Sequence, residues 1–120
     1  MSSLLVVDDD PHVRRLIELY LGEAGYDVDG AATGEEAIEA AASRQFDVAV
    51  IDLILPRYGG LRVCEKLKAS PHPPRVVIIT GDESDESRSL AAGAGADAFL
   101  MKPFTREELI GAVEAEDEPD

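Results

Sequence analysis

The chain has 120 residues, 45% of them hydrophobic, a size that suits one domain with a buried core. Its 25 acidic and 11 basic side chains give a net charge of −14, which excludes nonspecific nucleic-acid binding and binding to anionic membrane surfaces, since both need cationic side chains. The apolar runs are too short to span a bilayer and no charged-then-apolar leader opens the chain, so we expect a cytoplasmic location.

Strand and helix patterns alternate from the start of the chain. A strand is expected over 3–7, followed by a helix that Asp10 caps, with Pro11 in its first turn and Gly25 as its stop. The next run, 27–31, is the poorest strand candidate because two acids and a glycine flank its valine. This composition favours a strand at the edge of a sheet.

The rest of the chain continues the alternation. One helix opens at a capping box formed by Thr33 with Glu36, and the last helix opens at a second box formed by Thr105 with Glu108. The other strands are expected over 47–51, 75–80 and 98–101, and the other helices over about 60–69 and 84–92. Five strand–helix units of this length predict an α/β domain with helices on both faces of a parallel sheet.

Four of the apolar runs end on polar residues suited to phosphoryl transfer. The first ends on Asp8 and Asp9, the third on Asp52, the fourth on Thr80 and the fifth on Lys102. In an open α/β sheet, ligands bind at the carboxyl ends of the strands. We therefore expect three carboxylates, one hydroxyl and one ammonium to converge at one edge.

The three acids predict a metal site. Two carboxylates at about 4 Å repel by roughly 4 kcal/mol at an effective dielectric near 20. Oxygen ligands and few carboxylates favour Mg²⁺. Asp52 is then the candidate nucleophile, which would form an aspartyl phosphate, while Lys102 and Thr80 would bind phosphoryl oxygens.

The motifs that carry these residues resemble the response-regulator receiver domain of two-component signal transduction, over essentially the whole chain. The matching motifs are Val-Asp-Asp at 7–9, Asp-Leu-Ile-Leu-Pro at 52–56, Gly-Gly-Leu at 59–61, Ile-Ile-Thr-Gly at 78–81 and Lys-Pro-Phe at 102–104. The resemblance implies a doubly wound, flavodoxin-like fold, with five parallel strands in the order 2-1-3-4-5.

The resemblance also implies roles for individual residues of the pocket. Asp52 is similar to the phosphoacceptor, Asp9 to a direct Mg²⁺ ligand, and Asp8 to a ligand that binds the ion directly or through water. The backbone carbonyl of Ile54 would complete the protein's share of the coordination. Lys102 is similar to the lysine that pairs with the phosphoryl group, and its bond to the following proline is a candidate cis peptide.

Four residues correspond to positions that tune the family's response. Thr80 is similar to the switch hydroxyl and Phe99 to the aromatic switch residue that rotates with it. Ile54 and Asp82 occupy the two positions that tune hydrolysis of the acyl phosphate. Because an apolar side chain at position 54 cannot orient an attacking water, we expect a longer-lived phosphoryl group than in relatives with a polar residue there.

The function implied is that of a switch. A histidine kinase or a histidine phosphotransfer protein would phosphorylate Asp52, and the face formed by the fourth helix, fifth strand and fifth helix would then control a downstream protein or a missing output domain. The chain would not be an enzyme beyond promoting its own phosphorylation and dephosphorylation. We expect the receiver domain to cover 1–115 and a flexible acidic tail to cover 116–120.

Other readings stay open. The same fold could serve as a phosphorylation-independent interaction module, or as a metal-dependent phosphohydrolase that forms an aspartyl phosphate. The haloacid-dehalogenase type of phosphohydrolase has an aspartate where Ile54 stands, which disfavours turnover here. A flavodoxin is disfavoured because the acids after the first strand would repel a cofactor phosphate. We expect Cys64 to be a core thiol, and His12 and His72 to be surface residues without a metal.

Overall fold

In the computed structural model, which describes residues 2–82 and 84–114, five strands alternate with five helices. The strands are β1 (Ser3–Val7), β2 (Asp27–Ala31), β3 (Val48–Asp52), β4 (Arg75–Thr80) and β5 (Ala98–Met101). The helices are α1 (Pro11–Glu23), α2 (Gly34–Ser43), α3 (Gly60–Lys68), α4 (Asp85–Gly93) and α5 (Arg106–Glu114). The predicted third strand is displaced by one residue, because Asp52 pairs with Ile79 and so extends the ladder.

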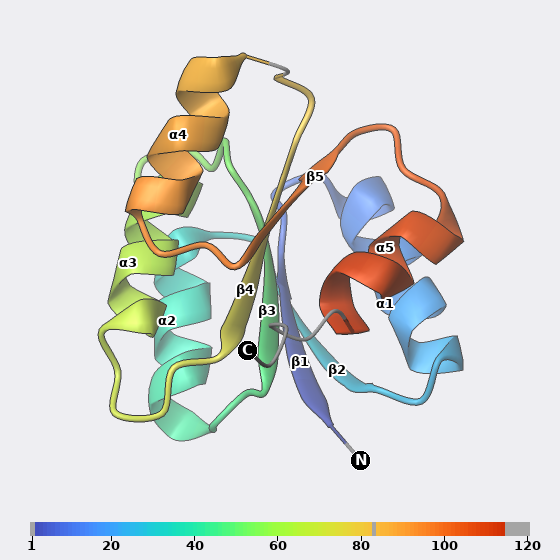
Figure 1. Ribbon diagram of the computed structural model, residues 1–120. Coiled ribbons are helices and arrows are strands. Elements are labelled where there is room, and N and C mark those ends of the chain that lie inside the picture. The colour runs from blue at the N-terminus through green and yellow to red at the C-terminus, as the bar shows by residue number, and fades with distance from the viewer. Residues whose placement is uncertain (1, 83, 115–120) are drawn as a thin grey trace, which may run out of the picture.

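All strand pairs are parallel and their order is β2-β1-β3-β4-β5. The predicted doubly wound fold is confirmed, and the poorest strand candidate, β2, lies at an edge. Figure 1 shows three layers, with α2, α3 and α4 on one face of the sheet and α1 and α5 on the other. The crossovers bring the carboxyl ends of β1, β3, β4 and β5 to one edge, where the polar residues follow.

The core lies on both faces of the three central strands. Leu5, Ile51 and Ile78 belong to the cluster under α2, α3 and α4, whereas Leu4 and Ile79 belong to the cluster under α1 and α5. All five side chains are fully buried. Full burial of such a side chain contributes about 1.5–3 kcal/mol, so the strands form a rigid floor beneath the site.

The two predicted capping boxes differ in detail. In the box of α5, Glu108 N donates to Thr105 Oγ1 (3.0 Å) and Thr105 N donates to Glu108 Oε1 (2.9 Å). In the box of α2, Glu36 N donates to Thr33 Oγ1 (3.1 Å), but the Glu36 carboxylate accepts from Ala32 N (3.4 Å). The box of α2 is therefore offset by one residue, because the Glu36 side chain reaches past Thr33 to the N–H of Ala32.

The described residues form one compact domain. Their Cα radius of gyration is 12.9 Å, close to the value of about 13 Å expected for a folded chain of this length. None of the helices among them combines the length and the apolar character that crossing a bilayer would require. The predicted acidic tail over 116–120 lies outside the described residues.

Candidate functional site

The three predicted acids gather where β1 and β3 end. The two strands are parallel neighbours, with Val7 opposite Ile51, so the residues that follow them emerge side by side. Asp8 is fully buried, Asp52 is 7% exposed and Asp9 is exposed. One carboxylate oxygen from each acid lies within 4.8 Å of the others, a cluster that could hold a metal ion. This confirms the predicted convergence of the three acids.

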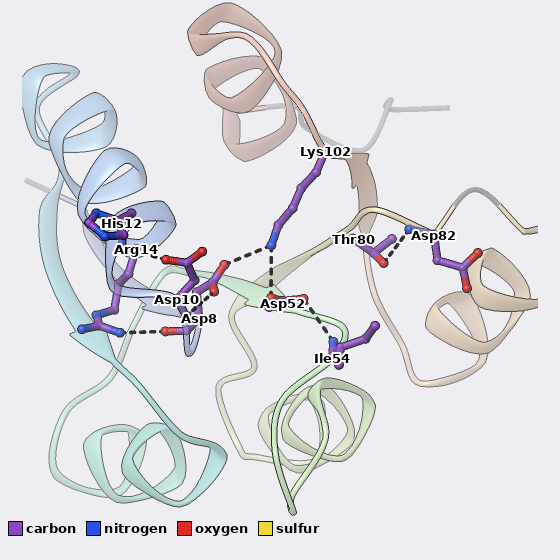
Figure 2. A network of polar contacts seen from close by, with 9 residues as sticks. All are labelled: Asp8, Asp10, His12, Arg14, Asp52, Ile54, Thr80, Asp82 and Lys102. Carbon is purple, nitrogen blue, oxygen red and sulfur yellow. Dashed lines mark hydrogen bonds and ion pairs between the residues drawn. The ribbon is translucent and has the colours of Figure 1, made fainter.

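Lys102 reaches the same cluster from the end of β5. Its Nζ lies 3.1 Å from Asp52 Oδ2 and 3.4 Å from Asp8 Oδ2 (Figure 2). Its backbone N–H donates to the Thr80 carbonyl at 2.8 Å, which anchors the residue beside β4. The Lys102–Pro103 bond is cis, as expected. The ammonium group therefore pairs with the two buried carboxylates of the cluster.

Charge and burial shift the pKa values in this pocket. Burial raises the pKa of Asp8 above 3.8, and the charge of Asp52 adds to that shift against the hydrogen bond from the Asp10 N–H. Burial of Lys102 favours its neutral form, but the charges of Asp52 and Asp8 outweigh this and raise its pKa. The ammonium group stays charged at neutral pH and partly neutralises the acids. One divalent cation would complete the neutralisation.

The loop between β1 and α1 holds Asp8 in place. Asp8 Oδ1 accepts from Asp10 N (2.9 Å), and Asp10 Oδ1 accepts from His12 N (2.9 Å), so that Asp10 caps α1 as predicted. Arg14 Nη1 donates to the Asp8 carbonyl at 2.8 Å (Figure 2). Arg14 has no distinguishing signal in the sequence, because an arginine among alternating charges on a helix is typical of a solvated face.

The loop between β3 and α3 shapes the other side of the pocket. Ile54 N donates to Asp52 Oδ1 at 3.1 Å, and the Ile54 side chain is 70% exposed. Gly60 packs against the start of this loop: an added Cβ would lie 2.1 Å from the Asp52 carbonyl oxygen and 2.8 Å from Leu53 Cα. Only glycine permits this close approach of the two backbone segments. The motif Gly-Gly-Leu thus supports the geometry of the predicted phosphoacceptor.

Thr80 ends β4 at the same edge and is buried, but its hydroxyl contacts a different group. Thr80 Oγ1 accepts from Asp82 N at 3.0 Å, and Figure 2 shows its side chain turned toward Asp82. The Asp82 carboxylate accepts from Ser87 Oγ (2.6 Å) and Ser84 N (2.9 Å), contacts that lower its pKa. Asp82 is therefore bound to the beginning of α4.

Phe99 lies on β5 opposite Ile78 of β4. Its half-buried side chain packs against the cluster under α2, α3 and α4. The guanidinium carbon of Arg88, on α4, lies 4.7 Å from the centroid of the Phe99 ring. Arg88 and Ser87 were not predicted, because α4 carries a weak apolar pattern that gives its polar residues no distinguishing signal.

The remaining residues that the sequence singled out lie outside the acidic cluster of Asp8, Asp9 and Asp52. Cys64 is fully buried, its Sγ lies 3.4 Å from the Ala94 carbonyl, and burial raises its pKa to about 11. The prediction of a core thiol is confirmed, since a reactive thiol needs a lowered pKa. His12 and His72 are exposed, and neither belongs to the three-acid group.

Known proteins of one family match this chain in sequence and in fold. The family model described as the response regulator receiver domain matches residues 4–114. Response regulator ArlR of Staphylococcus aureus is 32% identical over 115 residues, which are 96% of this chain and 52% of that protein. The chain thus spans about half the length of the curated relatives it matches.

Solved structures agree in fold. Chemotaxis protein CheY4 of Vibrio cholerae has a TM-score of 0.88 at 30% identity, covering 92% of this chain and 93% of that one. A response regulator of Burkholderia pseudomallei, solved with a phosphorylated aspartic acid, calcium ion and citrate, has a TM-score of 0.88 at 28% identity, covering 95% and 67%. With the matched residues running from the first strand to the last helix, the chain belongs to the response regulator receiver domain family.

Proposed function

We propose that this chain is a phosphoacceptor switch whose Asp52 receives a phosphoryl group. The observation that carries the proposal is the contact of Lys102 Nζ with Asp52 Oδ2 (3.1 Å) beside the cluster of Asp8, Asp9 and Asp52. Phosphoryl transfer depends mainly on positioning and charge stabilisation. A nucleophilic carboxylate, a fixed ammonium and a place for a cation provide both.

The residues present fit a hard divalent cation, and Mg²⁺ suits the site best. All candidate ligands are oxygens: the carboxylates of Asp8, Asp9 and Asp52 and the backbone carbonyl of Ile54. Asp9 is exposed, so that side of the cluster is open to the waters that Mg²⁺ usually retains. When bound, the ion would neutralise charge on the carboxylates and on the incoming phosphoryl group.

The transfer itself uses the side chains of this chain in three ways. A carboxylate oxygen of Asp52 forms the new O–P bond as the P–N bond of a phosphohistidine donor breaks, and the leaving imidazole nitrogen keeps that electron pair. Lys102 would pair with one phosphoryl oxygen. The Thr80 hydroxyl would give up its hydrogen bond from the Asp82 N–H and donate a hydrogen bond to another phosphoryl oxygen.

The response would be a population shift between two conformations. As Thr80 turns toward the phosphoryl group, space opens on the face of the sheet where Phe99 lies, and Phe99 would move inward. The surface of α4, β5 and α5 would then change for a downstream protein, or for an output domain in the longer part that the curated relatives have. Reaching 99:1 from 1:99 requires about 5.5 kcal/mol of differential interaction.

The proposed phosphodonor is a histidine kinase or a histidine phosphotransfer protein, which places the reaction in the cytoplasm. The chain would catalyse only its own phosphorylation and slow dephosphorylation. Ile54 favours this view over a phosphohydrolase, because its apolar side chain cannot act as an acid or base. A phosphorylation-independent interaction module would not need Lys102, Thr80 and three acids at one edge.

The test is incubation with acetyl phosphate and Mg²⁺, followed by intact mass measurement of the wild type and of Asp52→Asn. We expect the mass of one phosphoryl group on the wild type and none on the variant. Repeated release of phosphate from small phosphate esters would indicate a hydrolase. An unmodified wild type in the presence of Mg²⁺ would contradict the proposal.

A further inference from the structure

Two adjacent residues of α4 are linked to the two residues of the proposed switch, Ser87 to Thr80 through Asp82 and Arg88 directly to Phe99. Ser87 Oγ donates to Asp82 Oδ2 at 2.6 Å, and the guanidinium carbon of Arg88 lies 4.7 Å from the centroid of the Phe99 ring. Asp82 in turn donates its backbone N–H to Thr80 Oγ1. The beginning of α4 is therefore connected to Thr80 through Asp82, in two hydrogen bonds, and to Phe99 through the Arg88 guanidinium.

The connection to Thr80 is well defined. Ser87 is only 8% exposed, and its hydroxyl shares the Asp82 carboxylate with Ser84 N at 2.9 Å. With its carboxylate held at both oxygens, Asp82 presents its backbone N–H to Thr80 Oγ1 at 3.0 Å. The Thr80 hydroxyl is thus engaged on the α4 side of the pocket. Turning toward Asp52 requires that this contact be lost.

The connection to Phe99 acts on the same face of the sheet. Phe99 is paired with Ile78 of β4, and Thr80 lies two residues beyond Ile78 on the same strand. Because side chains alternate between the two faces of a sheet, the side chains of Thr80 and Phe99 both project to the face that α4 covers. A shallow hollow of about 190 Å³ between α4 and β5 is bordered by Arg88 and Phe99. The guanidinium group over the ring stabilises this half-buried position of Phe99 through a cation–π contact.

We propose that Ser87 and Arg88 together form a latch on α4 that holds the switch in its unphosphorylated conformation. This inference rests on the proposed function, and both are positioning residues, because neither touches the reacting atoms. A latch that stabilises only the inactive conformation reduces the fraction of molecules that is competent for the phosphoryl group. Removing it raises that fraction and so tightens apparent binding of a phosphoryl mimic.

The test measures the affinity for beryllofluoride with saturating Mg²⁺ by calorimetry. We expect Arg88→Ala and Ser87→Ala each to tighten binding by about two- to fivefold, and the double variant to show the product of the two factors. Arg88→Lys should retain part of the latch. Arg62→Ala is the matched control, since it removes a similar contact with the Tyr58 ring at 4.8 Å; Ser89→Ala is the control for the serine.

A second measurement needs no ligand. Hydrogen exchange of the Asp82 N–H should speed up by about two- to fivefold in both latch variants and stay unchanged in both controls. Unchanged or weaker beryllofluoride binding in the latch variants would overturn the proposal. If the wild type binds no beryllofluoride, the proposed function fails instead, and unchanged exchange at Asp82 in the variants would then overturn the latch on its own.

Discussion

Lys102 balances the charge of the acidic cluster, so replacing it should weaken the metal-free fold and strengthen magnesium binding. Its ammonium lies 3.1 Å from Asp52 and 3.4 Å from Asp8. At an effective dielectric of 20, each contact attracts by about 5 kcal/mol. Three carboxylate pairs at distances of at most 4.8 Å repel by at least about 3.5 kcal/mol each, or at least about 10 kcal/mol together. The attraction and the repulsion are therefore of similar size.

Solvent screens these energies, because Asp9 is exposed and Lys102 is half-buried. We therefore expect Lys102→Met to lower the free energy of unfolding of the metal-free protein by about 2 kcal/mol, which corresponds to a fall in Tm of roughly 10 °C. Saturating Mg²⁺ should recover most of this loss, because a bound cation replaces the missing charge. By linkage, the variant should bind Mg²⁺ more tightly than the wild type.

The assay compares thermal unfolding in EDTA and in Mg²⁺, together with calorimetric Mg²⁺ titration. Lys68→Met is the matched control, since Lys68 pairs with Asp97 at 2.8 Å away from the acidic cluster. This control should lose stability to the same extent with and without Mg²⁺. Unchanged or weaker Mg²⁺ binding by Lys102→Met would show that the lysine and the metal do not compete for the same carboxylates.

Three further substitutions test other parts of the site. Burial raises the pKa of Asp8, so the carboxyl group keeps its proton to a higher pH in the folded state than in the unfolded state, and the metal-free protein loses stability as the pH rises above 3.8. Unfolding measured against pH without metal should show that Asp8→Asn does not have this loss. Equal pH profiles for the wild type and the variant would contradict this role of Asp8. Ile54→Asn should shorten the half-life of the phosphoryl group severalfold, measured by its decay after donor removal; an unchanged half-life would contradict the role of position 54. Gly60→Ala should cost more than about 2 kcal/mol and slow phosphorylation, because its Cβ meets the Asp52 carbonyl at 2.1 Å. Gly22→Ala, with open space around it, should not be destabilised, and equal losses in both variants would argue against the close approach.

The strand ends could be predicted because the signal lies in the chain itself. Each of the residues Asp8, Asp52, Thr80 and Lys102 ends or directly follows an apolar run, and parallel strands bring such positions to one edge. The edge position of β2 could also be predicted from the chain, because its two acids and its glycine do not suit a buried central strand. These features depend on burial and periodicity, which a single sequence records well.

The contacts around those positions could not be predicted. Arg14, Ser87 and Arg88 are polar residues on helices, where the same composition serves plain solvation. Which of them turns inward depends on how α1 and α4 lie on the sheet. The direction of the Thr80 hydroxyl is likewise decided by the Asp82 N–H, a local contact in a loop whose conformation the apolar pattern does not report.

The central claim is that Asp52, and no other acid of the cluster, receives the phosphoryl group in a magnesium-dependent reaction. Reduction with borohydride after acetyl phosphate treatment converts an aspartyl phosphate to homoserine, and peptide mass mapping locates that residue. We expect homoserine at position 52 with Mg²⁺ and none with EDTA. Homoserine at position 8 or 9, or equal labelling of position 52 without the metal, would contradict it.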